Sequence, residues 1–371
     1  MSGFGTKAVV VTYPDEFARR EILELAKAGG YDVKEVVTHR DLGRSEYGVG
    51  SGKAQELEGL VADTESDTII IDDSMTSSQA NNLSRLTHAS VVDRERLILN
   101  IFAKRAATTE AKLQVQLAEL RYELPRAREA VRHSVRGEQA GFSGMGEYAV
   151  DVKFRALKRQ MAFIKDKLEK TKTVRGLHAS ERRKLGVPFV SLAGYTSSGK
   201  TTLFNRLAAE SKDASPDLFT TLSTTTRMVA FQNFRRKILL SDTVGFISRL
   251  PTYLVESFRS TLDELRHADL VLLMIDVSES PESIGIKLRS CRETLSELEV
   301  EPSKLLVVLN KIDLLDIRTR SKIEFDPLFK DYSTVKISAV RGDGMHQLRT
   351  KVLERTDPRR LARRPGLTTQ K

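Results

Sequence analysis

The stretch Gly194-Tyr-Thr-Ser-Ser-Gly-Lys-Thr201 decides the fold, because it fits the phosphate-binding pattern G-x-x-x-x-G-K-[ST]. It follows the apolar run VPFVSLAG and precedes the helix-forming sequence TTLFNRLAAE, which is the strand–loop–helix context that the motif requires. Its glycines let backbone N–H groups wrap a phosphate chain. We expect Lys200 to contact the β- and γ-phosphates and the Thr201 hydroxyl to bind Mg²⁺. The expected nucleotide contacts here are Gly194, Tyr195, Thr196, Ser197, Ser198, Gly199, Lys200, Thr201 and Thr202.

The sequence Asn310-Lys-Ile-Asp313, at the end of another apolar run, predicts that the nucleotide is GTP. The Asp313 carboxylate only accepts hydrogen bonds, and guanine offers it a ring N–H beside an exocyclic amine, whereas adenine has no such pair. Asn310 and Lys311 would brace the site and cover the base. The alternative is a helix start with an acidic first turn. A backbone N–H that reads the guanine oxygen is expected after the last strand, at Ser338, Ala339 and Val340.

Two segments between these motifs have the order expected for the metal and the γ-phosphate. Asp242-Thr-Val-Gly245 follows a strand-like run, which suits a carboxylate that holds Mg²⁺ through water and a Gly245 N–H that meets the γ-phosphate. A threonine-rich stretch around LFTTL (218–222) is placed where a switch loop supplies a second hydroxyl, and spacing leaves open which threonine does so. The expected nucleotide contacts here are Phe219, Thr220, Thr221, Asp242, Thr243, Val244 and Gly245.

Phe246 follows Gly245, at the position where Ras-like enzymes carry a water-orienting glutamine. A phenylalanine side chain cannot orient water. The sequence therefore predicts slow hydrolysis by the isolated protein and stimulation by a partner.

The pattern of apolar runs predicts an α/β fold in four parts. Residues 1–108 alternate short β-branched runs with amphipathic segments, which indicates βαβ units and a small parallel sheet. Residues 109–185 carry two apolar seams typical of a basic, antiparallel helical hairpin, with Pro125 interrupting or ending the first helix and a flexible loop at about 131–150. Residues 186–355 contain the motifs within a mostly parallel sheet, and residues 356–371 form a basic tail.

Composition favours a cytoplasmic protein with a polyanionic partner. The 371 residues carry a formal net charge of +10 and one cysteine, Cys291, which fits a reducing compartment. Residues 153–184 hold twelve Lys and Arg against three Asp and Glu, so phosphates are attractive partners for this stretch, although a solvated helix face explains it too. No signal peptide, transmembrane segment or DNA binding is expected; a monomeric state is expected, and peripheral contact with a membrane is left open.

A second glycine-rich stretch, Gly48-Val-Gly-Ser-Gly-Lys53, resembles a phosphate loop but departs from the pattern. It has one residue too few between its outer glycines, and Ala54 replaces the metal-binding hydroxyl. Nucleotide binding, a basic contact loop and a plain turn before a helix remain open for it.

Long stretches of the chain resemble the HflX family, within the Obg–HflX group of translation-factor-related P-loop GTPases. They include YGVGSGKAQEL (47–57), IIIDDSMTSSQANNL (69–83), residues 91–126, GYTSSGKTTLFNRL, LFTTLSTTTR and LSDTVGFISRLP. The resemblance implies an N-terminal HflX domain, a two-helix linker and a G domain that binds the large ribosomal subunit. It also implies that Thr221 is the switch threonine, that Phe246 is usual after DTVG, and that some members bind ATP through the N-terminal domain.

With this resemblance, the sequence predicts a Mg²⁺-dependent GTPase that switches between GTP and GDP states on ribosomal RNA of the large subunit, in ribosome splitting or rescue. Lys200, Thr221 and Gly245 are the expected catalytic residues, and Thr201, Thr221 and, through water, Asp242 the metal ligands. The segment 131–150 departs from the Arg- and Gly-rich form GxGTRGPGE of bacterial members, and no domain is expected after the short tail. The alternatives are a regulatory GTPase with a protein or membrane partner, and an RNA-binding or remodelling module stabilised by GTP.

Overall fold

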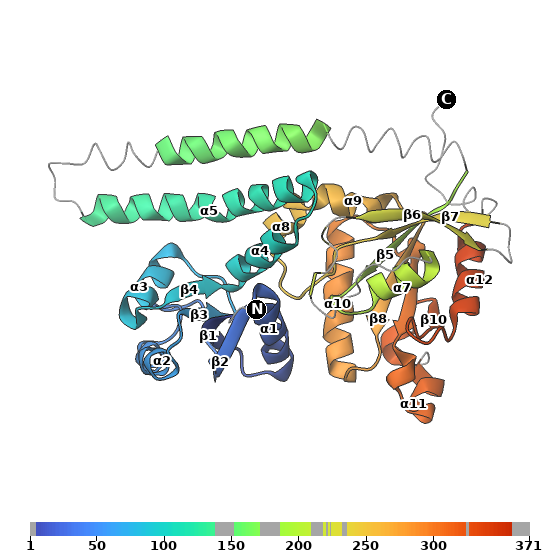
Figure 1. Cartoon of the computed structure of the whole chain (residues 1–371), viewed down its shortest axis with the longest axis horizontal. Helices are drawn as coiled ribbons and strands as arrows, with labels where there is room; N and C mark the ends of the chain where they lie inside the picture. The colour runs from blue at the N-terminus through green and yellow to red at the C-terminus, as the bar shows by residue number, and fades with distance from the viewer. Residues whose placement is uncertain are drawn as a thin grey trace. The chain divides into compact units, whose positions relative to one another are not determined.

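The chain is described by a computed structural model, which covers residues 5–137, 152–170, 186–208, 218–219, 222, 224–231, 236–323 and 326–357. It folds as two compact units, Met1–Glu169 and Lys170–Lys371. Each unit is built around its own β-sheet, as predicted, and each is described by itself (Figure 1).

The first unit contains a four-stranded parallel sheet with the order β2-β1-β3-β4. Short β-branched runs form its strands, which is why the sequence pattern located them. The elements are β1 (Thr6–Thr12), α1 (Glu16–Gly29), β2 (Tyr31–Thr38), α2 (Ser51–Thr64), β3 (Thr68–Ile71), α3 (Ser77–Thr87), β4 (Ser90–Asp93) and α4 (Arg94–Arg105).

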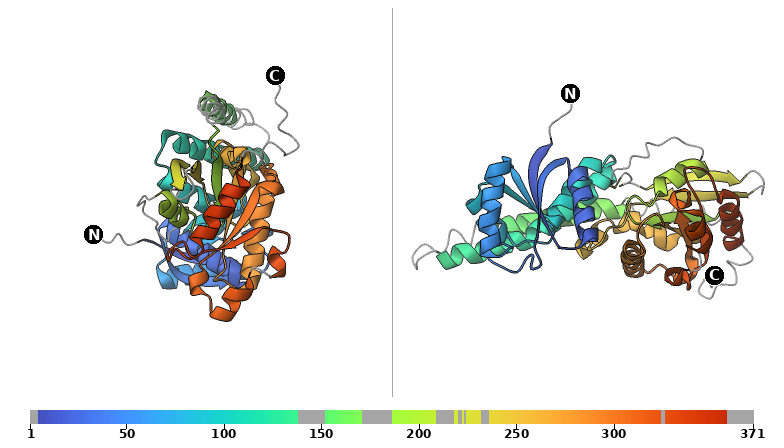
Figure 2. Two further views of the ribbon diagram at one scale, coloured as in Figure 1. Left: turned by 90° about the vertical axis from the view of Figure 1, so that its right-hand side faces the viewer. Right: turned by 90° about the horizontal axis from the view of Figure 1, so that it is seen from below.

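Helices cover both faces of this sheet. Alternate strand residues, such as Val9 and Ile69, pack against Leu57 of α2 and Leu83 of α3. The contacting pair α1 and α4 lies on the opposite face, as the views in Figures 1 and 2 show. Successive side chains of a strand point to opposite faces, so a strand covered on both sides is apolar throughout.

A buried ionic cluster lies at the carboxyl edge of the sheet. The Arg94 guanidinium donates to Asp72 (2.7 Å) and to Glu21 (2.5 Å), and the Thr12 hydroxyl also donates to Asp72 (2.6 Å). Burial alone lowers the pKa of Arg94, but the two carboxylates outweigh it and the net shift is upward. The charged cluster therefore ties β1, α1, β3 and α4 together.

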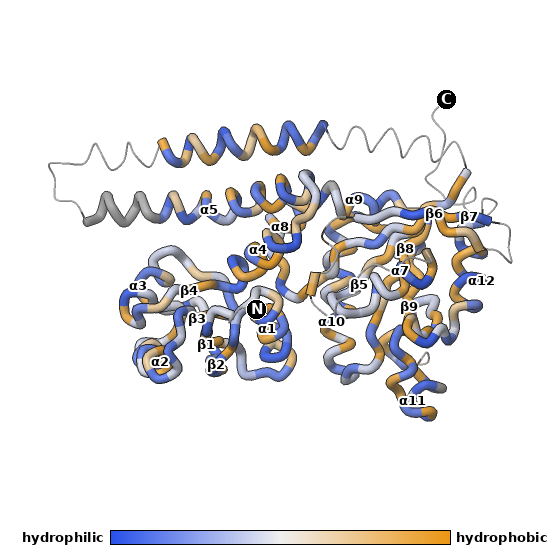
Figure 3. The backbone as a smooth tube through the Cα atoms, in the orientation of Figure 1, coloured by the Kyte–Doolittle hydropathy of each residue, from blue (hydrophilic) through white to orange (hydrophobic). Residues whose placement is uncertain are grey.

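Two long helices complete the first unit. The helix α5 (Thr109–Gly137) pairs with the helix over residues 152–170, and the two run antiparallel (Figure 1). Leu117, Ile164 and Leu168 form the core of the pair, so the predicted apolar seams do meet. Apolar and polar residues alternate along both helices in Figure 3.

The prediction that Pro125 interrupts or ends the first helix is wrong, because α5 continues to Gly137. Contacts on both sides of the proline hold the helix in place. Tyr122 donates to Asp93 (3.1 Å), Arg126 donates to Asp93 (2.5 Å), and the Ser77 N–H donates to Glu129 (3.0 Å). Part of the predicted 131–150 loop is thus helical, and residues 138–150 lie outside the described part of the chain.

The second unit contains a six-stranded sheet with the order β10-β9-β8-β5-β7-β6. All its neighbours are parallel except β6 and β7, which are antiparallel. Its strands are β5 (Phe189–Gly194), β6 (Thr225–Phe231), β7 (Arg236–Asp242), β8 (Leu270–Asp276), β9 (Leu305–Asn310) and β10 (Thr334–Lys336). Its α-helices are α7 (Lys200–Ala208), α8 (Thr252–Ser257), α9 (Arg259–His267), α10 (Pro281–Glu297), α11 (Ile317–Lys322) and α12 (Met345–Arg355).

The core of this unit explains why its strands read as near-continuous apolar runs. Leu203 of α7 and Leu348 of α12 pack on one face against Leu192, Leu272 and Val308. The helix α10 lies on the opposite face of the sheet (Figure 1). No helix in the described ranges is long and apolar enough to cross a membrane.

Candidate functional site

The loop between β5 and α7 has a backbone that requires its glycines. Gly194 has φ 145° and Gly199 has φ 92°, values that side chains rarely tolerate. A Cβ on Gly199 would collide with the amide of Asn310, and one on Gly194 with the carbonyl of Met274. The sequence therefore folds here into a tight loop directly ahead of the α7 N-terminus, the kind of position where proteins bind phosphate.

Lys200 closes this loop from within. Its ammonium group donates to the carbonyl oxygens of Gly194 (3.0 Å) and Tyr195 (2.8 Å), and its side chain is buried. Burial lowers the pKa of Lys200 to about 8, although the charge of Asp242 opposes that shift. A buried cation at the N-terminus of a helix suits a polyphosphate.

Thr201 and Asp242 meet at the end of the loop. The Thr201 hydroxyl donates to the Asp242 carboxylate (2.9 Å), and Asp242 is fully buried. Hydroxyl and carboxylate oxygens are the hard ligands that Mg²⁺ prefers, and few protein ligands suffice where phosphates and waters supply the rest. The oxygens present therefore fit Mg²⁺.

The segment after Asp242 lies directly on the phosphate loop. Phe246 donates its N–H to the Gly194 carbonyl (3.0 Å) and accepts from the Thr196 N–H (2.8 Å). The Ser248 N–H donates to the Tyr195 hydroxyl (2.6 Å). A Cβ on Gly245 would lie 2.9 Å from a Thr196 methyl group, so glycine is the residue that allows this approach. The Phe246 ring is buried and presents no group that could orient water.

Asn310 connects the phosphate loop to the segments that follow β9 and β10. Its amide nitrogen donates to the Ser198 carbonyl (2.9 Å), and its amide oxygen accepts from the Ala339 N–H (3.0 Å). One buried side chain at the end of β9 thus ties two loops together at the carboxyl edge of the sheet. Loops at this edge are where ligands bind in open α/β sheets.

Lys311 and Asp313 of the NKID motif each lie near an opposite charge. Lys311 pairs with Asp276 (2.5 Å) at the end of β8, and the Arg341 guanidinium lies 4.0 Å from the Asp313 carboxylate. Arg206 of α7 donates to the carbonyls of Ala339 (2.5 Å) and Val340, which fixes the loop after β10.

Sequence reasoning missed Asp276 and Arg206. Asp276 was detectable in principle, because it ends an apolar strand next to β9 and acidic residues there face the same edge. Arg206 has no such signal, because it is one of many cations on amphipathic helices. Its partners are also carbonyl groups, which leave no trace in a side-chain pattern.

The structure does not bring every predicted residue to the site. Thr220 and Thr221 lie outside the described residues. The Thr243 hydroxyl donates to the Leu192 carbonyl (2.6 Å), so this side chain faces the sheet, and only its backbone is available to a nucleotide. Phe219 is buried and has φ 55°.

The glycine-rich stretch at 48–53 has the contacts of a turn before a helix. Gly43 donates to the Gly48 carbonyl (2.8 Å), and a Cβ on Gly48 would lie 2.6 Å from the Met75 methyl group. Ala54 lies on the buried face of α2, in the core of the N-terminal sheet, and Lys53 pairs with Glu56 (2.6 Å). These contacts favour the turn among the three alternatives.

The sheet order, the phosphate loop and the NKID segment together define a P-loop GTPase. Three family models match the chain: GTP-binding GTPase N-terminal (residues 17–103), GTP-binding GTPase Middle Region (105–182) and 50S ribosome-binding GTPase (189–311). The chain belongs to the HflX family of GTPases. Membership of this family implies GTP binding with the usual Mg²⁺ dependence.

Relatives in both archaea and bacteria support this assignment. GTPase HflX of Thermococcus kodakarensis is 42% identical over 302 residues, which is 81% of this chain and 68% of that protein. GTPase HflX of Escherichia coli is 36% identical over 338 residues, 91% of this chain and 78% of that protein. Among solved structures, SsGBP in complex with GDP matches with a TM-score of 0.52 and 28% identity, covering 94% of this chain and 98% of that one.

Proposed function

We propose that this chain hydrolyses GTP with Mg²⁺ and couples its GTP and GDP states to association with the large ribosomal subunit. The observation that carries the nucleotide part is the convergence, on one edge of the sheet, of the loop after β5, Asp242 at the end of β7 and Asn310 at the end of β9. The match of residues 189–311 to the 50S ribosome-binding GTPase family supports the ribosomal part.

In this proposal, Lys200 binds the β- and γ-phosphates and the Gly245 N–H meets the γ-phosphate. Thr201 and, through water, Asp242 would hold Mg²⁺, with Thr221 as the source of a second hydroxyl, and the bound ion would supply charge neutralisation at the phosphates. The backbone of the loop excludes water around the phosphates and orients them, with Asn310 bracing it through Ser198.

Guanine recognition is assigned to Asp313, which accepts from two neighbouring donors of the base. Lys311 covers the base while its ammonium group pairs with Asp276. The N–H groups after β10, at Ser338, Ala339 and Val340, read the guanine oxygen. Arg206 contributes indirectly by holding the carbonyls of that loop.

Hydrolysis by the isolated protein is proposed to be slow and partner-stimulated. The residue after Gly245 is the buried Phe246, which has no polar group for the attacking water. Its backbone also pairs with the phosphate loop through Gly194 and Thr196. A partner that moves the segment around Phe246 would place a different group beside the γ-phosphate, where the attacking water must be oriented.

The helix over residues 152–170 is the proposed contact with ribosomal RNA. Its exposed cations are Lys153, Arg155, Lys158, Arg159, Lys165, Lys167 and Lys170. The Phe163 ring is 61% exposed, and the Lys167 ammonium lies 4.4 Å from its centre. Lys and Arg side chains attract the phosphates of RNA, and an exposed aromatic ring among them can stack on an unpaired base. We propose that the protein acts as a cytoplasmic monomer.

Salt-dependent co-sedimentation with purified large ribosomal subunits tests this proposal. We expect pelleting with a non-hydrolysable GTP analogue, less pelleting with GDP, and loss of both at high salt. Equal pelleting in both nucleotide states would contradict the switch. Absence of pelleting, with binding to anionic vesicles instead, would favour the membrane partner. The accompanying measurement is GTP turnover with and without large subunits.

A further inference from the structure

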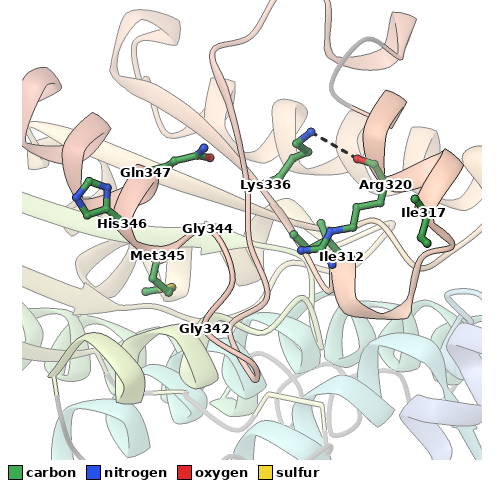
Figure 4. Close-up of a pocket in the computed structure, with 9 residues that line it drawn as sticks. All are labelled: Ile312, Ile317, Arg320, Lys336, Gly342, Gly344, Met345, His346 and Gln347. Carbon is green, nitrogen blue, oxygen red and sulfur yellow. Dashed lines mark hydrogen bonds between the residues drawn. The ribbon is translucent and has the colours of Figure 1, made fainter.

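A groove of about 710 Å³ lies between α11 and the start of α12, apart from the phosphate loop. We call it the α11–α12 groove. Figure 4 shows Ile317 and Arg320 on one side of the turn at Gly342 and Gly344, and Met345 and His346 on the other. Of the NKID residues Asn310 to Asp313, only Ile312 lines this groove.

The lining of the α11–α12 groove combines aliphatic and cationic side chains. Ile317 is 88% exposed, and Leu314, just before α11, is 64% exposed. Ile317 lines the groove and offers its exposed side chain to an aliphatic group, whereas Leu314 lies outside the lining. Arg320 and Lys336 add positive charge beside Ile317, with the Lys336 ammonium 3.5 Å from the Arg320 carbonyl. The groove is therefore suited to an occupant that has both aliphatic and acidic groups.

The floor of the α11–α12 groove is joined to the loop that is proposed to read guanine. The Ser338 N–H donates to the Asp343 carbonyl (3.0 Å), and the Gly342 N–H donates to the Ser338 carbonyl (2.7 Å). Arg320 of α11 pairs with the Asp343 carboxylate (2.9 Å). A ligand that binds Arg320 therefore competes with the Asp343 carboxylate. The carbonyl of the same Asp343 accepts from the Ser338 N–H, so the two contacts are coupled.

We propose that the α11–α12 groove binds an acidic, aliphatic segment of a partner protein, and that this binding accelerates GDP release. The aliphatic side chain of the segment packs between Ile317 and Met345, and its carboxylates bind Arg320 and Lys336. Nucleic acid has the charge but few aliphatic groups to bury against these residues. Displacement of Asp343 from Arg320 loosens the loop at Ser338, which lowers the affinity for the base.

A methyl-labelled sample of the full chain with GDP tests the binding step. The probes are a twelve-residue peptide of Glu and Leu, a matching peptide of Lys and Leu, and a twelve-nucleotide oligouridylate. We expect saturable shifts of the Ile317 and Met345 methyl signals with the Glu and Leu peptide alone. No saturable shift, or equal shifts with the RNA or the basic peptide, would overturn the proposed partner chemistry.

Variants locate the binding and test its consequence. Ile317→Glu and Lys336→Glu should each weaken peptide binding about tenfold or more, whereas the matched control Lys330→Glu, an exposed lysine outside the groove, should not.

Saturating peptide should speed release of a fluorescent GDP about fivefold or more. Unchanged release with the peptide bound would refute the coupling. Neither measurement uses ribosomes, so both stand apart from the ribosomal proposal.

Discussion

At the scale of single residues, two buried side chains brace the phosphate loop by contacting its backbone. Lys200 holds two carbonyl groups of its own loop, and Asn310 holds a third from outside. Buried polar groups that lose such a partner are costly, because water cannot replace it. Substitutions at these positions therefore act on both the shape and the charge of the site.

Lys200→Ala removes the cation that is proposed to bind the β- and γ-phosphates. We expect GTP turnover to fall about a hundredfold or more, the scale of losing one group that stabilises transition-state charge. Single-turnover phosphate release measures the effect, and circular dichroism verifies that the variant is folded. Lys330→Ala, at an exposed lysine away from the loop, is the control. Turnover close to that of the unmodified chain would contradict the role of Lys200.

Asp313→Asn tests which residue reads the base. The amide can donate to the xanthine oxygen, whereas the carboxylate accepts from the guanine amine. We expect GTP affinity to fall about a hundredfold or more and XTP to become the better ligand. Competition against a fluorescent guanine nucleotide provides the measurement. Should guanine selectivity survive intact, base recognition belongs to another residue.

The sequence predicted residues that stand in a recognisable motif and missed Asp276 and Arg206, which support the motifs from other elements. Lys200, Thr201 and Asn310 stand in recognisable patterns next to apolar strands, which fixed their place on the sheet edge. Arg206 was not predictable, because its partners after β10 are more than a hundred residues away and are carbonyl groups.

At the scale of elements, Arg94 joins the segments of the N-terminal sheet. Arg94→Met leaves Glu21 and Asp72 buried without their cation, which should cost about 3–5 kcal/mol of stability. Urea unfolding of the first unit measures this loss. Arg20→Met, which breaks an exposed pair with Glu24, should cost at most about 1 kcal/mol. Equal effects of the two substitutions would show that burial of the Arg94 cluster is unimportant.

The helix α5 shows why local sequence rules failed at one point. Proline disfavours a helix interior by about 3 kcal/mol relative to alanine, so the sequence predicted an end at Pro125. Tyr122, Arg126 and Glu129 instead fasten the helix to β4 and α3, and these tertiary contacts lie beyond any local pattern. The apolar seams of the two helices were predictable, because their spacing is local.

Pro125→Ala should therefore stabilise α5 by about 1–3 kcal/mol, because it restores a backbone hydrogen bond in a helix that already exists. Amide hydrogen exchange across α5 measures the change, with the exchange of α1 as an internal control. Faster exchange around residue 125 would mean that the contacts of Arg126 require the proline.

At the scale of the whole molecule, charges in the first unit should affect the chemistry of the second only when a ribosome is present. Lys158 and Arg159 lie on the exposed face of the 152–170 helix, and their removal leaves the nucleotide residues untouched. The double variant Lys158→Glu and Arg159→Glu should keep its basal GTP turnover, bind large subunits more weakly and lower the salt slope of binding by about two.

Co-sedimentation and turnover, both measured across a salt series, decide this prediction. Lys27→Glu combined with Lys330→Glu, two exposed lysines away from the helix, matches the charge change and should leave the slope closer to that of the unmodified chain. If both double variants lose the same affinity and slope, then net charge alone attracts the subunit. A loss confined to the helix variant would make the 152–170 face the part of the molecule through which ribosomal RNA is bound.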